Sequence, residues 1–191
     1  MAELVAEKTQ TLANLLTAFE GESNANARYT AFAVKADEDG WHGVASLFRA
    51  AARAEQIHAN NHARVIRQLG GEAKREIHPV DVQTTFHNLR VALAGEQHEI
   101  DTMYPAFLSE ATAGNLSAAI RTFTRALEAE KTHAQLYREA IKLVGAGEKE
   151  SWVGSERDFY VCAVCGYTSA TPEEEHCPVC NLSWDKFEVI R

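Results

Sequence analysis

Hydrophobic residues recur at steps of three and four along most of the chain, which is the spacing of one face of an α-helix. The four stripes lie within residues 12–33, 44–69, 89–107 and 116–144. Short breaks at Gly40 and Gly114 predict antiparallel neighbours, whereas the longer connection over residues 70–84 permits a crossover. The pattern therefore predicts a mainly α protein, a four-helix bundle with one long crossover.

Proline and cysteine positions refine this division of the chain. Pro105 lies inside the third stripe, where its missing N–H predicts a bend in the helix. All four cysteines lie in the last thirty residues, beyond the final stripe. We therefore expect the bundle over residues 1–145, a polar linker over 146–155, and a small cysteine-bearing domain of short strands and turns over 156–191.

Composition narrows the class of protein further. The 191 residues carry a net charge of −8, and 46% of them are hydrophobic, without an apolar run of 18 residues. The negative charge argues against nucleic-acid binding and anionic membranes as partners, and the short apolar runs argue against a membrane span. Charges within the first ten residues, where a signal peptide needs an apolar core, predict a cytoplasmic protein.

Each hydrophobic stripe is interrupted by one glutamate. The four are Glu22, Glu55, Glu96 and Glu130. A buried carboxylate without a partner is costly, so it protonates, pairs or binds a metal. Residues at equal distance from the turn of an antiparallel helix pair lie at one level. Glu22 should therefore face Glu55, and Glu96 should face Glu130.

Histidines complete a ligand pattern at this level. His58 and His133 each lie three residues after a stripe glutamate, on the same helix face. A glutamate from each of two helices, with Glu-x-x-His from the other two, is the pattern of di-iron and di-manganese carboxylate bundles. The imidazole nitrogens favour iron over magnesium or calcium. We expect a metal pair whose charge offsets the four carboxylates.

Several side chains near the predicted ligands could bind the metals or hydrogen-bond to a ligand, and others are expected to do neither. Glu99 lies three residues after the glutamate of the third stripe and offers a fifth carboxylate. Tyr29 and Tyr104, about two turns from the stripe glutamates of their helices, are candidates to hydrogen-bond a ligand. His62 is expected to be a hydrogen-bonded core histidine, and Glu20 a solvent-exposed carboxylate.

The cysteines form two Cys-x-x-Cys units. They are Cys162 with Cys165, and Cys177 with Cys180. Gly166 and Asn181 follow these units, and both residue types tolerate the left-handed backbone that turns N–H groups toward thiolates. Paired units of this kind make a tetrahedral four-thiolate metal site. The residues alone leave the metal open between zinc, which would be structural, and iron, which would carry one electron.

Together these motifs resemble the rubrerythrin family over nearly the whole chain. The segments that carry the resemblance are residues 15–23, Glu55-x-x-His58, residues 94–99 with 103–105, Glu130-x-x-His133, and the two cysteine units. The resemblance implies a ferritin-like bundle fused to a rubredoxin-like domain. It also implies a non-haem di-iron peroxidase that reduces hydrogen peroxide to water in defence against oxidative stress.

The resemblance also implies roles for single residues. The ligands of the oxidised iron pair would be Glu22, Glu55, Glu96, Glu99, Glu130 and His133. Glu55 and Glu130 would bridge the ions, and His58 would replace Glu99 upon reduction. The family favours iron in the four-cysteine site. It implies electrons from NAD(P)H through rubredoxin or a reductase. It also implies a head-to-tail homodimer, in which the thiolate iron of one subunit serves the di-iron site of the other, or a larger homo-oligomer.

Other functions remain open on the residues alone. The chain could be a ferritin-like iron-storage or ferroxidase protein, or a structural protein stapled by zinc. A mineralising cage needs neither Glu99 nor a cysteine domain, which argues against storage. A di-iron oxygenase would need a cavity for an organic substrate, which the sequence does not reveal.

Overall fold

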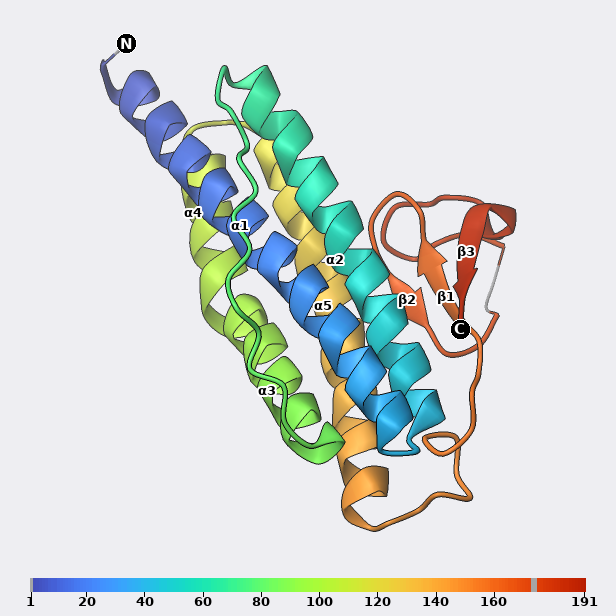
Figure 1. Ribbon diagram of the computed structural model, residues 1–191. Coiled ribbons are helices and arrows are strands. Elements are labelled where there is room, and N and C mark those ends of the chain that lie inside the picture. The colour runs from blue at the N-terminus through green and yellow to red at the C-terminus, as the bar shows by residue number, and fades with distance from the viewer. Residues whose placement is uncertain (1, 173–174) are drawn as a thin grey trace.

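A four-helix bundle with a small β-sheet domain docked on one side forms the structure (Figure 1). This computed structural model describes residues 2–172 and 175–191. The helical segments are α1 (Ala2–Glu38), α2 (His42–Gln68), α3 (Thr85–His98), which continues through the π-helical η1 (Glu99–Met103) into α4 (Tyr104–Ala113), and α5 (Ser117–Gly145). The mainly α bundle predicted from the hydrophobic stripes is confirmed.

The connections follow the glycine-containing breaks. Gly40 takes φ 75° in the turn between α1 and α2, and Asn115 takes φ 51° before α5. Residues 69–84 form the long crossover, which runs beside α1 to the start of α3 (Figure 1). Thr84 then caps α3, because its side chain accepts a hydrogen bond from the backbone N–H of His87 at 3.3 Å. The long crossover is thus confirmed.

The third helical segment departs from α geometry upstream of its proline. In η1 the backbone N–H of Tyr104 bonds to the carbonyl of Glu99, an i→i+5 pattern. Pro105 follows in the first turn of α4, where a missing N–H is tolerated. The irregularity therefore begins at Glu99 rather than at the proline, and short π segments are frequent at functional sites.

Two hydrophobic clusters fill the bundle, one on each side of a polar layer. One cluster includes Phe32, Phe48 and Tyr137, and the other includes Leu15 and Phe123. Along α1 the first cluster begins at residue 25 and the second ends at residue 19, which leaves a gap of buried polar residues. The stripe glutamates lie in this layer.

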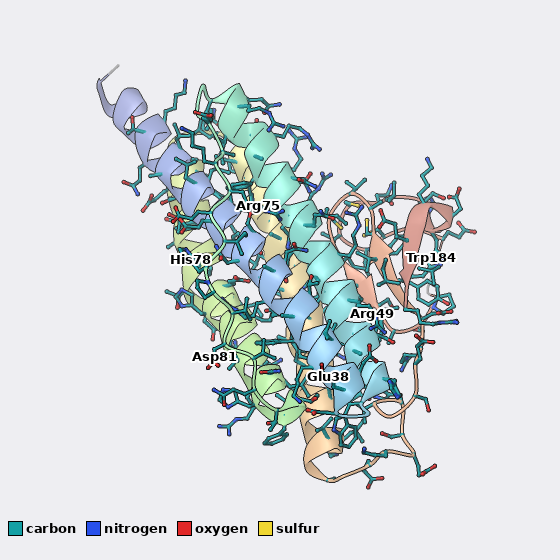
Figure 2. The ribbon with its side chains drawn as sticks, in the orientation of Figure 1. Glu38, Arg49, Arg75, His78, Asp81 and Trp184 are labelled. Carbon is teal, nitrogen blue, oxygen red and sulfur yellow. The ribbon has the colours of Figure 1, made fainter. Side chains whose placement is uncertain are left out.

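The C-terminal domain is a three-stranded antiparallel sheet in the order β2-β1-β3. Its elements are β1 (Phe159–Cys162), β2 (Thr168–Ser169), the 3₁₀ turn η2 (Trp184–Lys186) and β3 (Phe187–Ile190). Arg53 of α2 holds Glu188 of β3 through two hydrogen bonds of 2.6 and 2.7 Å. In Figure 2, Arg49 lies on the same side of the bundle as Trp184, away from the crossover residues His78 and Asp81.

The segment before this sheet packs against the bundle backbone. A side chain at Gly43 of α2 would place its Cβ only 1.8 Å from the carbonyl oxygen of Trp152, so glycine permits this close approach. Asn61 of α2 also donates from Nδ2 to the carbonyl of Val164 at 2.8 Å. In the part of the chain that the structure describes, no helix is both long and apolar enough to cross a membrane.

Candidate metal centres

The four stripe glutamates and two histidines meet at the centre of the bundle. One group of potential ligands is Glu22, Glu55, His58 and Glu130, and a second is Glu55, Glu96, Glu130 and His133. Within each group, one ligand atom from each residue lies within 4.8 Å of the others, and all are buried. Glu55 and Glu130 belong to both groups, so two adjacent cations could share them.

His58 presents one ring nitrogen to three carboxylates. Its Nδ1 lies 2.9 Å from Glu55 Oε2, 2.9 Å from Glu130 Oε1 and 3.8 Å from Glu22 Oε1. Its Nε2 lies 2.9 Å from the carbonyl oxygen of Cys165, which can only accept a hydrogen bond. In the neutral ring the proton therefore sits on Nε2, and the Nδ1 lone pair faces the carboxylates. A cation between them would satisfy both.

The same logic applies to His133. Thr168 donates its hydroxyl to the carbonyl of Gly166 at 3.0 Å, so its oxygen accepts from His133 Nε2 at 3.1 Å. This leaves His133 Nδ1 as the lone-pair nitrogen, 2.8 Å from Glu130 Oε2 and 3.4 Å from Glu55 Oε1. Metal-ligating histidines are held in this way, with the outer nitrogen hydrogen-bonded.

Unsatisfied polar atoms concentrate in this cluster. Among the described residues, nine buried side-chain nitrogen or oxygen atoms have no hydrogen-bond partner, and six belong to the stripe glutamates and His133. Both oxygens of Glu130 are among them. Leaving such atoms unpaired in a core costs free energy, and metal coordination would remove the penalty. The donor set therefore fits a pair of cations.

Without a metal, protons occupy part of the cluster. Burial lowers the pKa of His58, but Glu130 and Glu55 outweigh it and raise that pKa well above its usual value. Burial, followed by the charges of Glu130 and Glu55, raises the pKa of Glu96 to about 8. A divalent cation would displace these protons, so metal binding here must compete with protonation.

Glu99 lies at the edge of the cluster. It is half-buried, whereas the stripe glutamates are at most 1% exposed. Burial first, and then the charge of Glu99, raise the pKa of Glu22 well above its usual value. Glu99 belongs to neither four-residue group among the described residues. The structure thus holds His58 in the cluster and leaves Glu99 beside it.

Two tyrosines fix carboxylates from outside the cluster. Tyr29 donates its hydroxyl to Glu96 Oε1 at 2.7 Å, and Tyr104 donates to Glu22 Oε1. Both are buried. His62 is confirmed as a buried, hydrogen-bonded histidine, and Glu20 is confirmed as exposed, paired with His78 at 3.1 Å.

The four cysteine sulfurs lie together at the other centre, all within 4.8 Å of one another. Cys162 Sγ is 3.4 Å from Cys180 Sγ, and Cys165 Sγ is 3.5 Å from Cys177 Sγ. A tetrahedron with metal–sulfur bonds of about 2.3 Å has edges of about 3.8 Å, close to these values.

The backbone around the sulfurs is arranged for thiolates. Gly166 takes φ 80° and Asn181 takes φ 61°, which confirms the left-handed turns. Hydrogen bonds from the thiols of Cys162 and Cys165, together with the backbone N–H groups of Cys180 and Val179, lower the pKa of Cys177 despite its burial. Cys180 is half-exposed, whereas the other three cysteines are buried.

Some of these contacts could not be predicted from the sequence. Thr168 and the carbonyl of Cys165 reach the bundle only because of how the C-terminal domain docks, which no local pattern reports. Thr122, whose hydroxyl oxygen lies 3.1 Å from His62 Nδ1, could have been identified from its position in the sequence. It lies about two helical turns before Glu130, on the same face of α5.

A family model and the curated relatives of this chain indicate the same protein family. A family model described as Rubrerythrin matches residues 13–141. Rubrerythrin-2 of Clostridium acetobutylicum is 37% identical over 177 residues, covering 92% of this chain and 94% of the relative. Nigerythrin of Nitratidesulfovibrio vulgaris is 36% identical over 178 residues, covering 93% of this chain and 85% of the relative.

Solved structures agree with these relatives. A mixed-valence structure of nigerythrin superposes with a TM-score of 0.84 at 35% identity, covering 94% of this chain and 86% of that one. A fully reduced nigerythrin structure is described as all ferrous and gives a TM-score of 0.83. Bacterioferritin of Desulfovibrio desulfuricans gives 0.73 at 22% identity, covering 79% of this chain and 91% of that one. That likeness shows the ferritin-like fold alone.

Proposed function

Because the chain belongs to the rubrerythrin family of oxidoreductases, we propose that it is a non-haem di-iron peroxidase that reduces hydrogen peroxide to water. The observation that carries the proposal is the shared histidine. His58 faces three carboxylates through Nδ1 and bonds to Cys165, within the four-cysteine centre, through Nε2. A storage protein or a zinc-stapled structural protein would have no use for such a connection.

The proposed ligands follow from the two groups. One iron would be held by Glu22, His58 and the bridging pair Glu55 and Glu130; the other would be held by Glu96, His133 and the same pair. The position of His58 in the cluster, with Glu99 outside both groups, supports the reduced ligand set that the resemblance implies as the one for this arrangement. Glu99 would replace His58 on oxidation.

The reaction consumes two electrons and two protons for each peroxide and releases two waters. A reduced iron pair would supply both electrons together, so the O–O bond could break without release of a hydroxyl radical. The protein's own residues exclude water from the site and hold its carboxylates in position. The hydrophobic clusters on either side exclude bulk water, and Tyr29 and Tyr104 fix the carboxylates by hydrogen bonds.

Electrons would enter through an iron held by the four cysteines. Cys180 is the half-exposed ligand and offers an outer donor the shortest approach to the sulfurs. We propose that NAD(P)H supplies these electrons through rubredoxin or a reductase. In this chain the carbonyl of Cys165 accepts a hydrogen bond from His58 of the same chain, which favours a contact between the centres within one subunit over the contact between subunits that the resemblance implies. A cytoplasmic location and a homo-oligomer remain predictions.

The test is a stoichiometric peroxide titration. The iron-loaded protein is reduced without oxygen, and peroxide consumption is followed together with the visible absorbance of the ferric–thiolate centre. We expect rapid peroxide loss with matching oxidation of the thiolate iron. Peroxide consumption without any change at the thiolate centre would favour a storage or oxidase role. No peroxide consumption at all would show that the bundle site is structural.

A further inference from the structure

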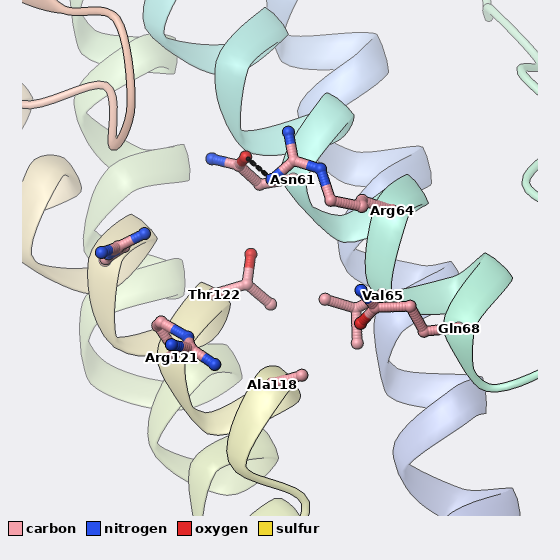
Figure 3. A pocket seen from close by; sticks show the side chains of 8 residues that line it. Asn61, Arg64, Val65, Gln68, Ala118, Arg121 and Thr122 are labelled. Atoms are coloured by element: carbon pink, nitrogen blue, oxygen red, sulfur yellow. Dashed lines mark hydrogen bonds between the residues drawn. The ribbon is translucent and has the colours of Figure 1, made fainter.

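A pocket of about 280 Å³ lies between α2 and α5, outside the metal cluster (Figure 3). Three arginines line it, Arg64 of α2 with Arg121 and Arg125 of α5. Arg64 and Arg121 are exposed, and Arg125 is half-exposed. We call these three side chains the arginine patch. Because the whole chain has a net charge of −8, the patch is a local positive region on a molecule that is negative overall.

Carboxylates of the described residues do not neutralise the arginine patch. In that part of the chain the arginines in ion pairs are Arg49, Arg53 and Arg191, and no member of the patch is among them. Arg64 donates to Asn61 Oδ1 at 3.2 Å, and this neutral amide leaves the positive charge in place (Figure 3). Guanidinium groups without a carboxylate partner remain free to pair with carboxylates of another molecule.

The patch borders the four-cysteine centre. Arg125 also lines a second pocket of about 860 Å³, whose wall includes Cys177 and Cys180. Cys180 is the half-exposed cysteine of the centre. Asn61, on the wall of the first pocket, donates to the carbonyl of Val164 in the first cysteine unit. Because the two pockets share Arg125, a partner protein with an ordinary interface would cover both the patch and Cys180.

The two pockets differ in charge. Beside Arg125, the second pocket is lined by the exposed Glu175, so these two charges nearly cancel. Among the described residues, neither an aspartate nor a glutamate lines the first pocket. An acidic partner would therefore place its carboxylates over the first pocket, which leaves its neighbouring surface over the second pocket and Cys180.

We propose that the arginine patch is the docking surface for an acidic protein that delivers single electrons to the four-cysteine centre. The inference rests on the proposed function, in which an outside donor supplies this centre. In each transfer the donor is oxidised by one electron and the ferric centre is reduced by one, with no bond formed or broken. The arginines do not react; they are positioning residues that hold the donor over Cys180.

The stoichiometry of the proposed reaction favours a charged, exposed docking surface. Each peroxide consumes two electrons, whereas an iron held by four thiolates passes one at a time, so a donor must arrive and leave twice in each turnover. Opposite charges raise the rate of association, and redox partners typically bury little area and separate quickly. Three exposed or half-exposed arginines beside a half-exposed cysteine meet both requirements.

The first test measures binding without electron transfer. Zinc replaces iron in the full-length chain and in a rubredoxin of net negative charge, and NMR follows the guanidinium Nε–H signals during titration. We expect the signals of Arg64, Arg121 and Arg125 to shift at about 20 mM salt and to shift much less at about 200 mM. Shifts confined to other arginines, or shifts that do not depend on salt, would overturn the proposal.

The second test measures reduction of the oxidised, iron-loaded chain by the same rubredoxin in its reduced iron form. One variant combines Arg64→Gln, Arg121→Gln and Arg125→Gln. At low salt we expect its second-order rate constant, followed by stopped-flow absorbance, to fall about 10- to 100-fold and to lose most of its salt dependence. Reduction by photoreduced deazaflavin, a small molecule that needs no docking surface, should stay at the wild-type rate. Glu175→Gln should raise the rate with rubredoxin.

The matched control makes the same change in net charge elsewhere. It combines substitutions of three arginines that line neither pocket and belong to α1, the crossover and α3, namely Arg28→Gln, Arg75→Gln and Arg90→Gln. We expect its rate constant to stay within about twofold of wild type. Equal losses in the patch and control variants would show that net charge alone sets the rate, and would overturn the docking surface.

Other occupants of the patch give different results. Inorganic phosphate that shifts the patch signals at constant ionic strength, without any shift from rubredoxin, would make the patch a small-anion site. A patch variant whose oligomer dissociates in sedimentation would make it an interface between copies of this chain. Either result overturns the proposal. A wild-type chain that accepts electrons from rubredoxin at the patch but does not reduce peroxide would overturn the proposed peroxidase function and leave the docking surface standing.

Discussion

His58 and Cys165 are joined by one hydrogen bond of 2.9 Å, from the ring Nε2 to the backbone carbonyl oxygen. Through the other ring nitrogen, His58 lies 2.9 Å from carboxylate oxygens of both Glu55 and Glu130. One side chain thus contacts both candidate metal centres. Docking of the cysteine domain and the geometry of the bundle site are therefore coupled.

Gly166→Ala should disturb this contact. Gly166 has φ 80°, and a Cβ there would lie 2.3 Å from His58 Nε2, so the variant combines backbone strain with displacement of His58. We expect a loss of about 1–3 kcal/mol in stability. We also expect slower electron transfer from the thiolate iron to the bundle, measured by stopped-flow absorbance after peroxide addition.

Gly147→Ala is the matched control for this variant. Gly147 also has a positive φ, 73°, but a Cβ there meets nothing within 4 Å. It should cost similar strain and leave electron transfer unchanged. If the two variants transfer electrons at the same rate, contact with His58 is not the route between the centres.

Thr168→Val should weaken metal binding in the bundle from outside it. The threonine oxygen accepts from His133 Nε2 at 3.1 Å and so keeps the lone pair on Nδ1. Without that acceptor, we expect the affinity for bundle iron to fall about 10- to 100-fold, measured by iron titration. Thr168→Ser should keep wild-type affinity. Equal affinity in the valine variant would contradict the role of Thr168.

The sequence predicted the bundle site better than its surroundings, for a physical reason. Glu22, Glu55 and Glu130 interrupt helical stripes, and the helix period alone places such residues at the centre of a bundle. The hydrogen bonds to Cys165 and Thr168 depend on tertiary docking, which leaves no periodic signal. Secondary-structure patterns likewise do not distinguish the π segment at Glu99 from a continuous α-helix.

Stability of the protein without bundle metal should fall as pH rises from about 4.5 to about 8. The pKa of Glu96 is about 8 in the folded chain against an ordinary value of 4.5, so between these values the folded state holds a proton that the unfolded state has lost. The stabilisation is complete below about pH 4.5 and is lost as pH rises through about 8. His58 changes stability in the same direction, because its pKa is also raised.

Glu96→Gln isolates the contribution of this carboxyl. The amide stays neutral, so the unfolding free energy of the metal-free variant should depend less on pH between 5 and 8.5 than that of wild type. Denaturant unfolding, followed by the circular dichroism signal of the helices, measures the unfolding free energy of the variant and of wild type at each pH. Glu72→Gln, at an exposed position of the crossover, is the control. A wild-type protein that becomes more stable with rising pH would refute this assignment.

Cys162→Ser should uncouple the two centres without emptying the bundle. The serine removes one of the four clustered sulfurs, whereas none of the bundle ligands is altered. We expect unchanged bundle iron but a large loss of NAD(P)H-linked peroxide turnover in the presence of rubredoxin and its reductase. Direct oxidation of the chemically reduced bundle by peroxide should persist. Undiminished NAD(P)H-linked turnover would mean that electrons bypass the cysteine centre.

Glu130→Ala should empty the bundle site while sparing the cysteine centre. Glu130 belongs to both ligand groups, and its two oxygens lie 2.9 Å from His58 Nδ1 and 2.8 Å from His133 Nδ1. Among the described residues, Glu55 is the one other residue that belongs to both groups. We expect metal analysis to find the bundle iron lost and the thiolate iron retained.

A neighbouring glutamate of α5 controls for charge and helix propensity in this experiment. Glu128 pairs with Lys131 at 2.6 Å on the outer face, so Glu128→Ala removes the same side chain without touching the cluster. It should bind iron as wild type does. If Glu130→Ala also retained two bundle irons at wild-type affinity, a carboxylate bridge at Glu130 would be excluded. The ions would then have to be held by Glu55 and the terminal ligands alone, which leaves each with fewer protein donors than the geometry offers.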